Sequence, residues 1–224
     1  MKHKNLLVLG ATGNTGRWVV NMALKRGHHV KALVRSKASL EERDGLEVVT
    51  GDVLDPEAVH RVMAGSDAVI SCLGIRKETP SDPRSPLTSP EDFAARSAKH
   101  IVDAMKTHGV DRLIAISSAG VGDSWSAVDP GLRSVIETSN IAIVFGDLDN
   151  MEKVYRGSGL DTLAVRPVAL VSGEATGSAR IVDRFDSSSK ISTGDVARWM
   201  LDAVERPVPF ERATEMIGCT RPTV

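Results

Sequence analysis

Short apolar runs alternate along the chain with longer segments in which apolar residues recur every three or four positions. The short runs are typical of buried strands, and the longer spacing is typical of amphipathic helices. Strands are expected at residues 6–9, 28–35, 46–50, 67–73, 113–117, 160–165 and 214–219. Helices are expected at residues 14–26, 56–64, 91–108 and 141–156, with a last helix that Ser192 or Thr193 caps and that ends at Arg206.

The alternation of strands and helices predicts an α/β fold, with a doubly wound parallel sheet in a three-layer αβα arrangement. Residues 121–140 are predicted to be irregular. Residues 75–90 hold four prolines, which exclude a helix or a central strand. This loop is either a substrate lid or a mobile insertion. We expect one domain over residues 1–224, with a small substrate-side region at 121–146 and 170–192.

Composition, net charge and cysteine spacing exclude several classes of binding partner. The 224 residues carry a formal net charge of −1, so no nucleic acid or membrane surface is expected as a partner. No apolar run approaches the roughly 20 residues that cross a bilayer, and we expect a cytoplasmic protein. Cys72 and Cys219 lie far apart without metal-ligand spacing, so no metal site is expected. A monomer or a small homo-oligomer is expected.

Three glycines at three-residue intervals separate the first expected strand from the first expected helix. A strand, a tight turn and a helix N-terminus together present backbone N–H groups to an anion, here the pyrophosphate of a dinucleotide. A plain tight turn is the alternative, because such spacings also arise by chance. The turn residues assigned to the cofactor are Gly10, Thr12, Gly13, Asn14, Thr15 and Gly16.

The second expected strand ends in basic residues, Arg35-Ser36-Lys37, with no acidic residue before Glu41. A carboxylate at this position binds the ribose 2′-OH of NAD, whereas an arginine suits the 2′-phosphate of NADP. The pattern therefore favours NADP(H) over NAD(H), with Arg35 and Ser36 as cofactor residues. The alternative is a solvated basic turn.

Polar or small residues follow the later strands, at the sheet edge where α/β proteins bind ligands. Asp52 can accept from the adenine amine and Val53 can pack on the ring, although Asp52 equally suits a turn cap. Gly74 permits close backbone approach. Ser117 and Ser118 can hydrogen-bond a substrate carbonyl or the nicotinamide carboxamide, or they simply end a strand.

Pro167 is expected to stop the sixth strand and to leave the backbone of residues 168–170 free beside the nicotinamide. Pro167 and Val168 are therefore added to the cofactor residues. Together these motifs predict an NAD(P)-binding Rossmann fold.

The chain also resembles the atypical short-chain dehydrogenases/reductases, the group that includes the NmrA-like proteins and biliverdin reductase B, or flavin reductase. The residues that carry the resemblance are spread over nearly the whole chain. They are residues 10–16, 33–35, 51–54, 73–76, 104–111, 117–119, 151–154, 158–160, 166–167, 191–192 and 195–197.

The resemblance implies roles for particular residues. It implies that the glycine turn holds the pyrophosphate and that Arg35 holds the 2′-phosphate. Asp52 and Val53 would then lie at the adenine. Leu73, Gly74 and Arg76 would line the ribose and diphosphate, and Ser117 and Ser118 would lie near the nicotinamide.

This sequence departs from those relatives on the substrate side. The Tyr-x-x-x-Lys pair of ordinary short-chain dehydrogenases is absent, and Tyr155, the only tyrosine, has Gly159 at the lysine position. Tyr155 is therefore predicted to pack rather than to act as an acid. Glu152 stands where biliverdin reductase B has histidine, and the loop after Arg76 is longer, so tetrapyrrole reduction is disfavoured.

Three functions fit this pattern. The first is an NADPH-dependent reductase of a small conjugated acceptor of flavin or quinone type, with Ser118 and Glu152 as candidate catalytic residues. Ser118 would orient the acceptor or the nicotinamide, and Glu152 would border the pocket. The second is a non-catalytic NADP(H)-binding redox sensor. The third, an epimerase or dehydratase acting on a sugar nucleotide, is disfavoured by the short C-terminal region.

Overall fold

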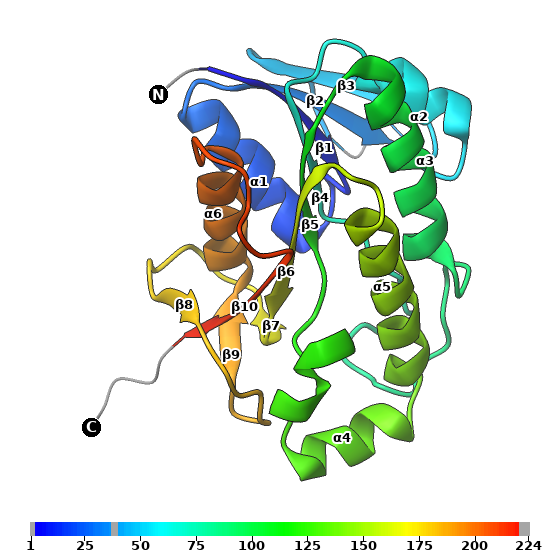
Figure 1. The fold of residues 1–224 in the computed structure, drawn as a ribbon, viewed down its shortest axis with the longest axis vertical. Helices are drawn as coiled ribbons and strands as arrows, with labels where there is room; N and C mark the ends of the chain where they lie inside the picture. Colours follow the sequence, from blue (N-terminus) through cyan, green and yellow to red (C-terminus); the bar gives the residue numbers. More distant parts are fainter. Residues whose placement is uncertain (1–2, 37–39, 220–224) are drawn as a thin grey trace.

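A mostly parallel sheet forms the centre of the molecule (Figure 1). The computed structural model describes residues 3–36 and 40–219. Within them, eight strands lie side by side in the order β3-β2-β1-β4-β5-β6-β10-β8, and only the β10–β8 pair is antiparallel. The strands are β1 (Asn5–Leu9), β2 (His29–Val34), β3 (Leu46–Thr50), β4 (Ala68–Ser71), β5 (Arg112–Ile116), β6 (Asp161–Pro167), β8 (Ala179–Ile181) and β10 (Thr214–Cys219).

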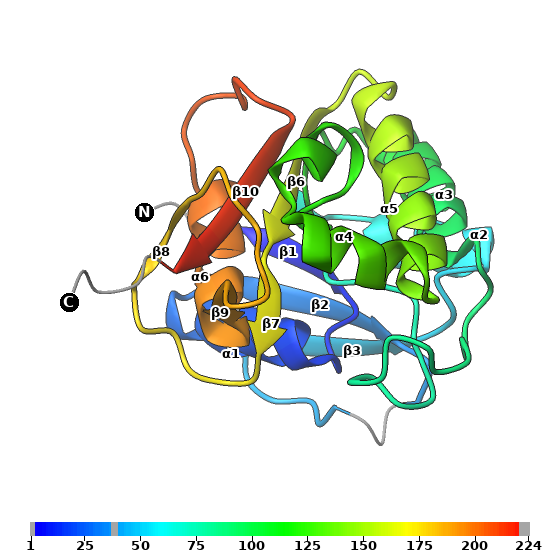
Figure 2. The same ribbon diagram turned by 90° about the horizontal axis from the view of Figure 1, so that it is seen from below.

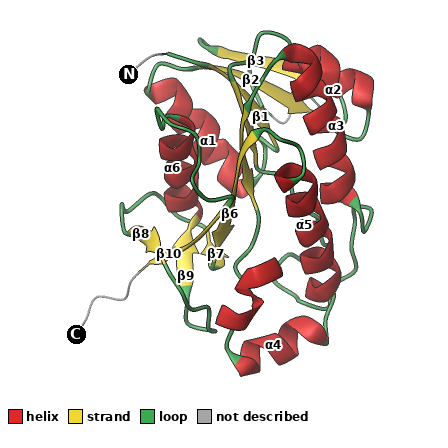
Figure 3. Cartoon of the chain, viewed as in Figure 1, coloured by secondary structure: helices red, strands yellow, loops and turns green. Residues whose placement is uncertain are grey.

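Helices cover both faces of this sheet (Figures 1 and 3). α1 (Asn14–Lys25) and α6 (Thr193–Val204) pack together on one face. α2 (Pro56–Met63), α3 (Phe93–His108) and α5 (Ile141–Arg156) cover the other face. The doubly wound, three-layer αβα fold predicted from the sequence is confirmed.

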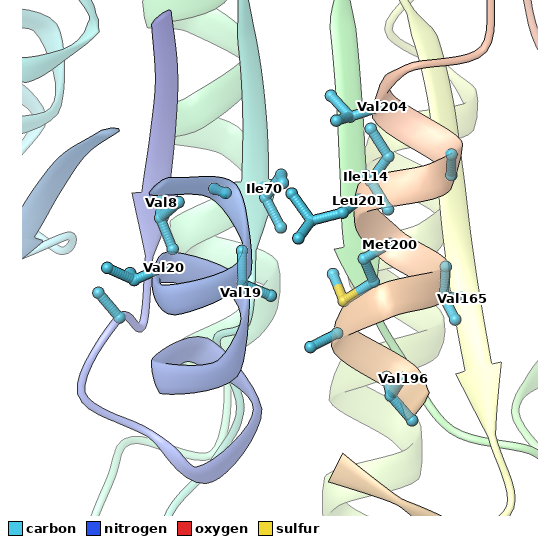
Figure 4. Packing of buried hydrophobic residues seen from close by; sticks show 14 of the residues in the cluster. Val8, Val19, Val20, Ile70, Ile114, Val165, Val196, Met200, Leu201 and Val204 are labelled. Carbon is cyan, nitrogen blue, oxygen red and sulfur yellow. The ribbon is translucent and has the colours of Figure 1, made fainter. Parts of the chain in front are cut away.

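The apolar faces of the helices meet the apolar strands in two core layers. Figure 4 shows one of them, where Val19 and Val20 of α1 and Met200 and Leu201 of α6 lie over the sheet. All four side chains are fully buried. Burying one such side chain stabilises the fold by about 1.5–3 kcal/mol, so this layer fixes α1 and α6 against the strands.

Local signals set the helix ends much as the sequence predicts. Asp55 accepts a hydrogen bond from the Glu57 N–H at 3.1 Å, and Pro56 opens α2. Gly109 ends α3 with φ +66°, a left-handed conformation that favours glycine. Ser192 caps α6 by accepting from the Asp195 N–H.

The prediction that residues 121–140 are irregular is wrong. They form the 3₁₀ helix η2 (Gly122–Ala127) and the helix α4 (Pro130–Glu137). The Asp129 side chain accepts from the Gly131 N–H at 2.8 Å, so Asp129 and Pro130 start α4 as Asp55 and Pro56 start α2.

Residues 168–192 also hold more regular structure than predicted. β7 (Ala169–Val171) pairs in parallel with β9 (Lys190–Ser192), and β8 extends the main sheet. Because η2 follows β5 and β7 follows β6, α4, β7 and β9 gather at the carboxyl ends of these two strands (Figure 2).

Candidate functional site

A cavity of about 370 Å³ opens beside the carboxyl ends of β1, β2 and β4. The strand order reverses between β1 and β4, and ligands of open α/β sheets bind at such a reversal. Nine predicted cofactor residues line this cavity, so the structure brings them together. They are Gly10, Thr12, Gly13, Arg35, Asp52, Val53, Leu73, Gly74 and Arg76.

The glycine turn between β1 and α1 is too tight for side chains. Gly10 has φ +74°, and a Cβ there would lie 2.6 Å from the Cys72 carbonyl oxygen. A Cβ on Gly16 would lie 2.1 Å from the Gly10 carbonyl oxygen. α1 begins without a side-chain cap or an acidic residue in its first turn, which leaves its positive dipole end uncompensated by any carboxylate there. The turn therefore fits a phosphate group.

The charged side chains of the cavity are two arginines and one carboxylate. Arg35 follows β2, and Arg76 and Asp52 come from the ends of two further strands. Asp52 Oδ1 accepts from the Leu54 N–H at 2.9 Å, and it is Asp55 that caps α2. The excess of positive charge suits an anionic ligand. Lys37, part of the basic run in the sequence, lies outside the described residues.

Other predicted cofactor residues do not line the cavity. Asn14 opens α1, while Thr15 and Gly16 are buried against the core. Ser36 follows Arg35 directly at the end of β2. Ser117, Ser118, Pro167 and Val168 lie at the ends of β5 and β6, on the other side of the strand-order reversal.

The prediction that Pro167 frees the backbone of residues 168–170 is wrong. β6 runs through Pro167, whose carbonyl oxygen accepts from the Ala119 N–H at 2.9 Å. The Val168 N–H donates to the Ile217 carbonyl oxygen at 2.9 Å, and residues 169–171 pair with β9. A proline lacks only its own N–H, so the neighbouring residues still join the sheet.

Glu152 does not border an open pocket as predicted. Its side chain is 1% exposed, and its carboxylate accepts from Arg166 Nε at 2.9 Å and from Arg166 Nη2 at 2.6 Å. Ser117 Oγ donates to Glu152 Oε1 at 2.6 Å. A carboxylate without a partner is too costly to bury, so Arg166 on β6 is what permits Glu152 to lie inside.

The same arginine reaches a second carboxylate. Arg166 Nη1 lies 2.5 Å from Asp123 Oδ1 on η2, and this hydrogen bond lowers the pKa of Asp123. Burial alone would lower the pKa of Arg166, but the two carboxylates raise it. Arg166 and Asp123 were not predicted as site residues. Arg166 lies 14 positions from Glu152 and 43 positions from Asp123, and no local sequence pattern links residues so far apart.

Tyr155 packs in the core, as predicted. Its side chain is 4% exposed, and burial raises the pKa of its hydroxyl. Tyr155 is therefore a core residue and does not take the place of the tyrosine in a Tyr-x-x-x-Lys pair.

The proline-rich loop is held at both ends. The Arg76 N–H donates to Ser89 Oγ and the Thr88 N–H donates to the Arg76 carbonyl oxygen, so the two ends lie together. At the tip, Asn140 Nδ2 donates to the carbonyl oxygens of Arg84 and Ser85. The end of this loop and the start of α3 add four residues to the cavity wall that were not predicted as site residues, Thr88, Ser89, Pro90 and Phe93.

Among residues 3–36 and 40–219, no three His, Cys, Asp or Glu side chains come together as a metal site would require. No helix in the described part of the chain is long and apolar enough to cross a membrane.

The chain has relatives among known proteins, in sequence and in fold. A family model described as NAD(P)H-binding matches residues 10–207. The chain belongs to this family. The resemblance to atypical short-chain dehydrogenases/reductases is confirmed as well, by relatives and solved structures that cover nearly the whole chain.

Among curated relatives, the photosystem II assembly factor Ycf39 of Trieres chinensis is 40% identical over 221 residues. The match covers 96% of this chain and 64% of that protein. The chain spans less than two thirds of the length of several curated relatives it matches, for example 63% of a chloroplastic Arabidopsis thaliana protein.

Two solved structures show the same fold. A short-chain dehydrogenase/reductase of Veillonella parvula, solved in complex with NADP, superposes with a TM-score of 0.78 at 15% identity. The match covers 97% of this chain and 95% of that one. The anaerobilin reductase ChuY of Escherichia coli O157:H7 superposes with a TM-score of 0.75 at 22% identity, over 95% and 96% of the two chains.

Proposed function

We propose that this protein is an NADPH-dependent reductase of a small conjugated acceptor of flavin or quinone type. The observation that carries the proposal is the cavity at the strand-order reversal, where the glycine turn and Arg35 border the same space. A pyrophosphate fits the turn, and a 2′-phosphate fits the guanidinium at the end of β2. The NADP complex of the V. parvula structure supports this choice of nucleotide.

In this proposal, some residues of the chain bind the nucleotide and others orient the acceptor. The turn N–H groups and Arg35 bind the phosphates, and Asp52 accepts from the adenine amine. The reduced nicotinamide supplies a hydride when it is bound. Ser118, whose hydroxyl donates only to the neighbouring Ala119 carbonyl at 3.1 Å, orients the acceptor.

The absence of a Tyr-x-x-x-Lys pair suits this class of acceptor. A flavin or a quinone takes up a hydride into a delocalised system, and solvent can supply the proton. A dedicated acid is then unnecessary, and the burial of both Tyr155 and Glu152 is no obstacle. The reductase activity in the name of ChuY, which shares the fold, is in keeping with the proposal.

The test is a screen of NADPH oxidation, followed by absorbance, with FMN, quinones and biliverdin as acceptors and NADH as the matched donor. We expect turnover with FMN or a quinone, faster with NADPH than with NADH at equal concentrations. Background rates with every acceptor would contradict the reductase proposal.

A second function has its own support. A non-catalytic NADP(H)-binding sensor needs no acid, and Ycf39, the 40% identical relative, is named an assembly factor rather than an enzyme. In that case the protein binds NADP+ and NADPH with similar affinity and oxidises neither in the screen. Nucleotide affinity measured beside the screen therefore separates the two functions.

A further inference from the structure

A chain of hydrogen bonds runs from the end of β5 through the interior to the surface. Ser117 donates to Glu152, Glu152 is paired with Arg166, and Arg166 reaches Asp123. The Glu152 and Arg166 side chains are 1% and 3% exposed, whereas the Asp123 side chain is 79% exposed. Ser117 follows β5 directly, at the edge of the sheet where α/β proteins bind their ligands, and Arg166 comes from the carboxyl end of the neighbouring strand β6.

This arrangement fixes the direction of the Ser117 hydroxyl. A guanidinium has only donors, and Arg166 Nε and Nη2 donate to the two oxygens of the Glu152 carboxylate. An ionised carboxylate can only accept hydrogen bonds. The single hydroxyl proton of Ser117 therefore points at Glu152 Oε1, 2.6 Å away, and only the oxygen lone pairs remain for a ligand.

We infer that Ser117 accepts a hydrogen bond from the carboxamide NH₂ of the nicotinamide, and that Glu152 and Arg166 are positioning residues that impose this polarity. Ser117 does not donate to a substrate carbonyl, since its hydroxyl proton is already donated to Glu152. The assignment rests on the nucleotide binding in the proposed function, and it holds whether or not the protein turns over an acceptor.

Ser118, the next residue along the chain, differs from Ser117 in its hydrogen bonding. Its hydroxyl donates to the Ala119 carbonyl oxygen at 3.1 Å, a neutral and adjacent acceptor. A neutral bond of this kind is about half as strong as one to an ionised group. The two neighbouring serines thus differ in what they offer, a fixed acceptor at Ser117 and an adjustable hydroxyl at Ser118.

The test uses three ligands whose binding is measured by calorimetry without turnover. NADP+ carries the carboxamide, 3-acetylpyridine adenine dinucleotide phosphate replaces its NH₂ with a methyl group, and 2′,5′-ADP lacks the nicotinamide. We expect Ser117→Ala to raise the Kd for NADP+ about 5- to 20-fold, the loss expected when a buried amide loses its acceptor. The Kd values for the other two ligands should change less than about twofold.

Glu152→Gln tests the positioning role at nearly constant volume. The new amide group can donate to Ser117 Oγ, which releases the hydroxyl proton toward the ligand. We expect the same loss for NADP+ alone. Ser97→Ala is the matched control, because Ser97 is a buried serine that donates to Phe93 within α3. Circular dichroism and 2′,5′-ADP binding report whether each variant is folded. If Glu152→Gln does not fold, the result for Ser117→Ala decides the assignment.

Each other outcome overturns the assignment. Equal losses for NADP+ and the acetyl analogue would show that Ser117 does not accept from the NH₂, as would an unchanged affinity for NADP+. If the wild-type protein bound none of the three ligands, the proposed function itself would fail. The Kd values for the three ligands therefore distinguish an error in the hydrogen-bond direction at Ser117 from an error in the proposed cofactor.

Discussion

At the scale of single residues, two arginines of this chain have opposite surroundings. Arg166 is buried and holds two carboxylates, so its donors serve the protein itself. Arg35 is exposed at the rim of the cavity. A ligand phosphate can therefore pair with Arg35, while Arg166 can act on a ligand only through its partners.

Arg35→Glu reverses the charge at the end of β2. We expect the Kd for NADP+ to rise about 10- to 100-fold, the range that corresponds to a lost charged hydrogen bond of 1.5–3 kcal/mol. The Kd for NAD+, which has no 2′-phosphate, should change much less. Both values are measured by fluorescence titration. Lys106→Glu, the same charge change near the far end of α3, is the control, and equal losses for both nucleotides would refute the 2′-phosphate role.

Arg166→Met removes the partner of a buried carboxylate. We expect this variant to lose about 3–5 kcal/mol of unfolding free energy, because the buried Glu152 carboxylate loses its two-point partner and keeps only the Ser117 hydroxyl and the Arg156 guanidinium at 3.8 Å. The combined Arg166→Met/Glu152→Met variant should lose less than the sum of the two single changes, since the pair is then replaced by apolar groups. Urea unfolding of the four proteins gives the coupling. Additive losses would show that the pair does not act as a unit.

At the scale of elements, Asp195 joins the start of α6 to the loop before β8. Its carboxylate accepts from the N–H groups of Thr176 and Gly177 and from the hydroxyls of Thr176 and Ser192. Burial would raise the pKa of Asp195, but these hydrogen bonds hold it below its usual value. The ionised carboxylate thus stabilises the folded loop.

Asp195→Asn should cost about 1–3 kcal/mol at neutral pH, because an amide NH₂ cannot accept these bonds. The folded pKa is lowered, so the contribution is complete above the unfolded pKa of about 3.9 and is lost as the pH falls through the folded value. The difference between wild type and variant in urea unfolding should therefore be constant above about pH 5 and shrink below pH 4. Asp44→Asn, at an exposed site, is the control; a difference that grows in acid would contradict this account.

The elements show what the sequence could and could not predict. Long periodic segments such as α3 and α5 were predicted within two residues, because one apolar face specifies a helix. The eight-residue α4 and the three-residue β7, β8 and β9 were missed, because segments this short carry too little pattern. In the site, the glycine turn is local and was found. The Glu152–Arg166 pair joins two different elements and became visible only in the folded chain.

At the scale of the whole molecule, a bound nucleotide should hold together several strand ends of the sheet. The cavity collects residues from β1, β2 and β4 together with the proline-rich loop, whose tip is tied to Asn140 before α5. A ligand in this cavity would contact segments that lie far apart in the sequence. It would therefore oppose the unfolding of the whole structure, because it binds only the folded state.

NADP+ at about 100 times its Kd should stabilise the fold by about 2.7 kcal/mol. For a chain of this size we expect the Tm to rise by about 5–10 °C in a thermal unfolding scan. The increase should follow the logarithm of the NADP+ concentration, and Arg35→Glu should shift this dependence to higher concentrations. No increase with NADP+ in the wild-type protein would contradict the assignment of the cavity.

The place of β10 has a consequence for how the chain reaches this structure. β10 lies inside the sheet, between β6 and β8, although it follows every other described strand in sequence. Until residues 214–219 exist, β6 has an unpaired edge and β8 has no neighbour in the main sheet. A chain still on the ribosome can thus form the strands from β3 to β6 but must complete the sheet after synthesis has passed Cys219. Such long-range parallel pairing is slow, so the pairing of β10 with β6 is expected to be a late step of folding.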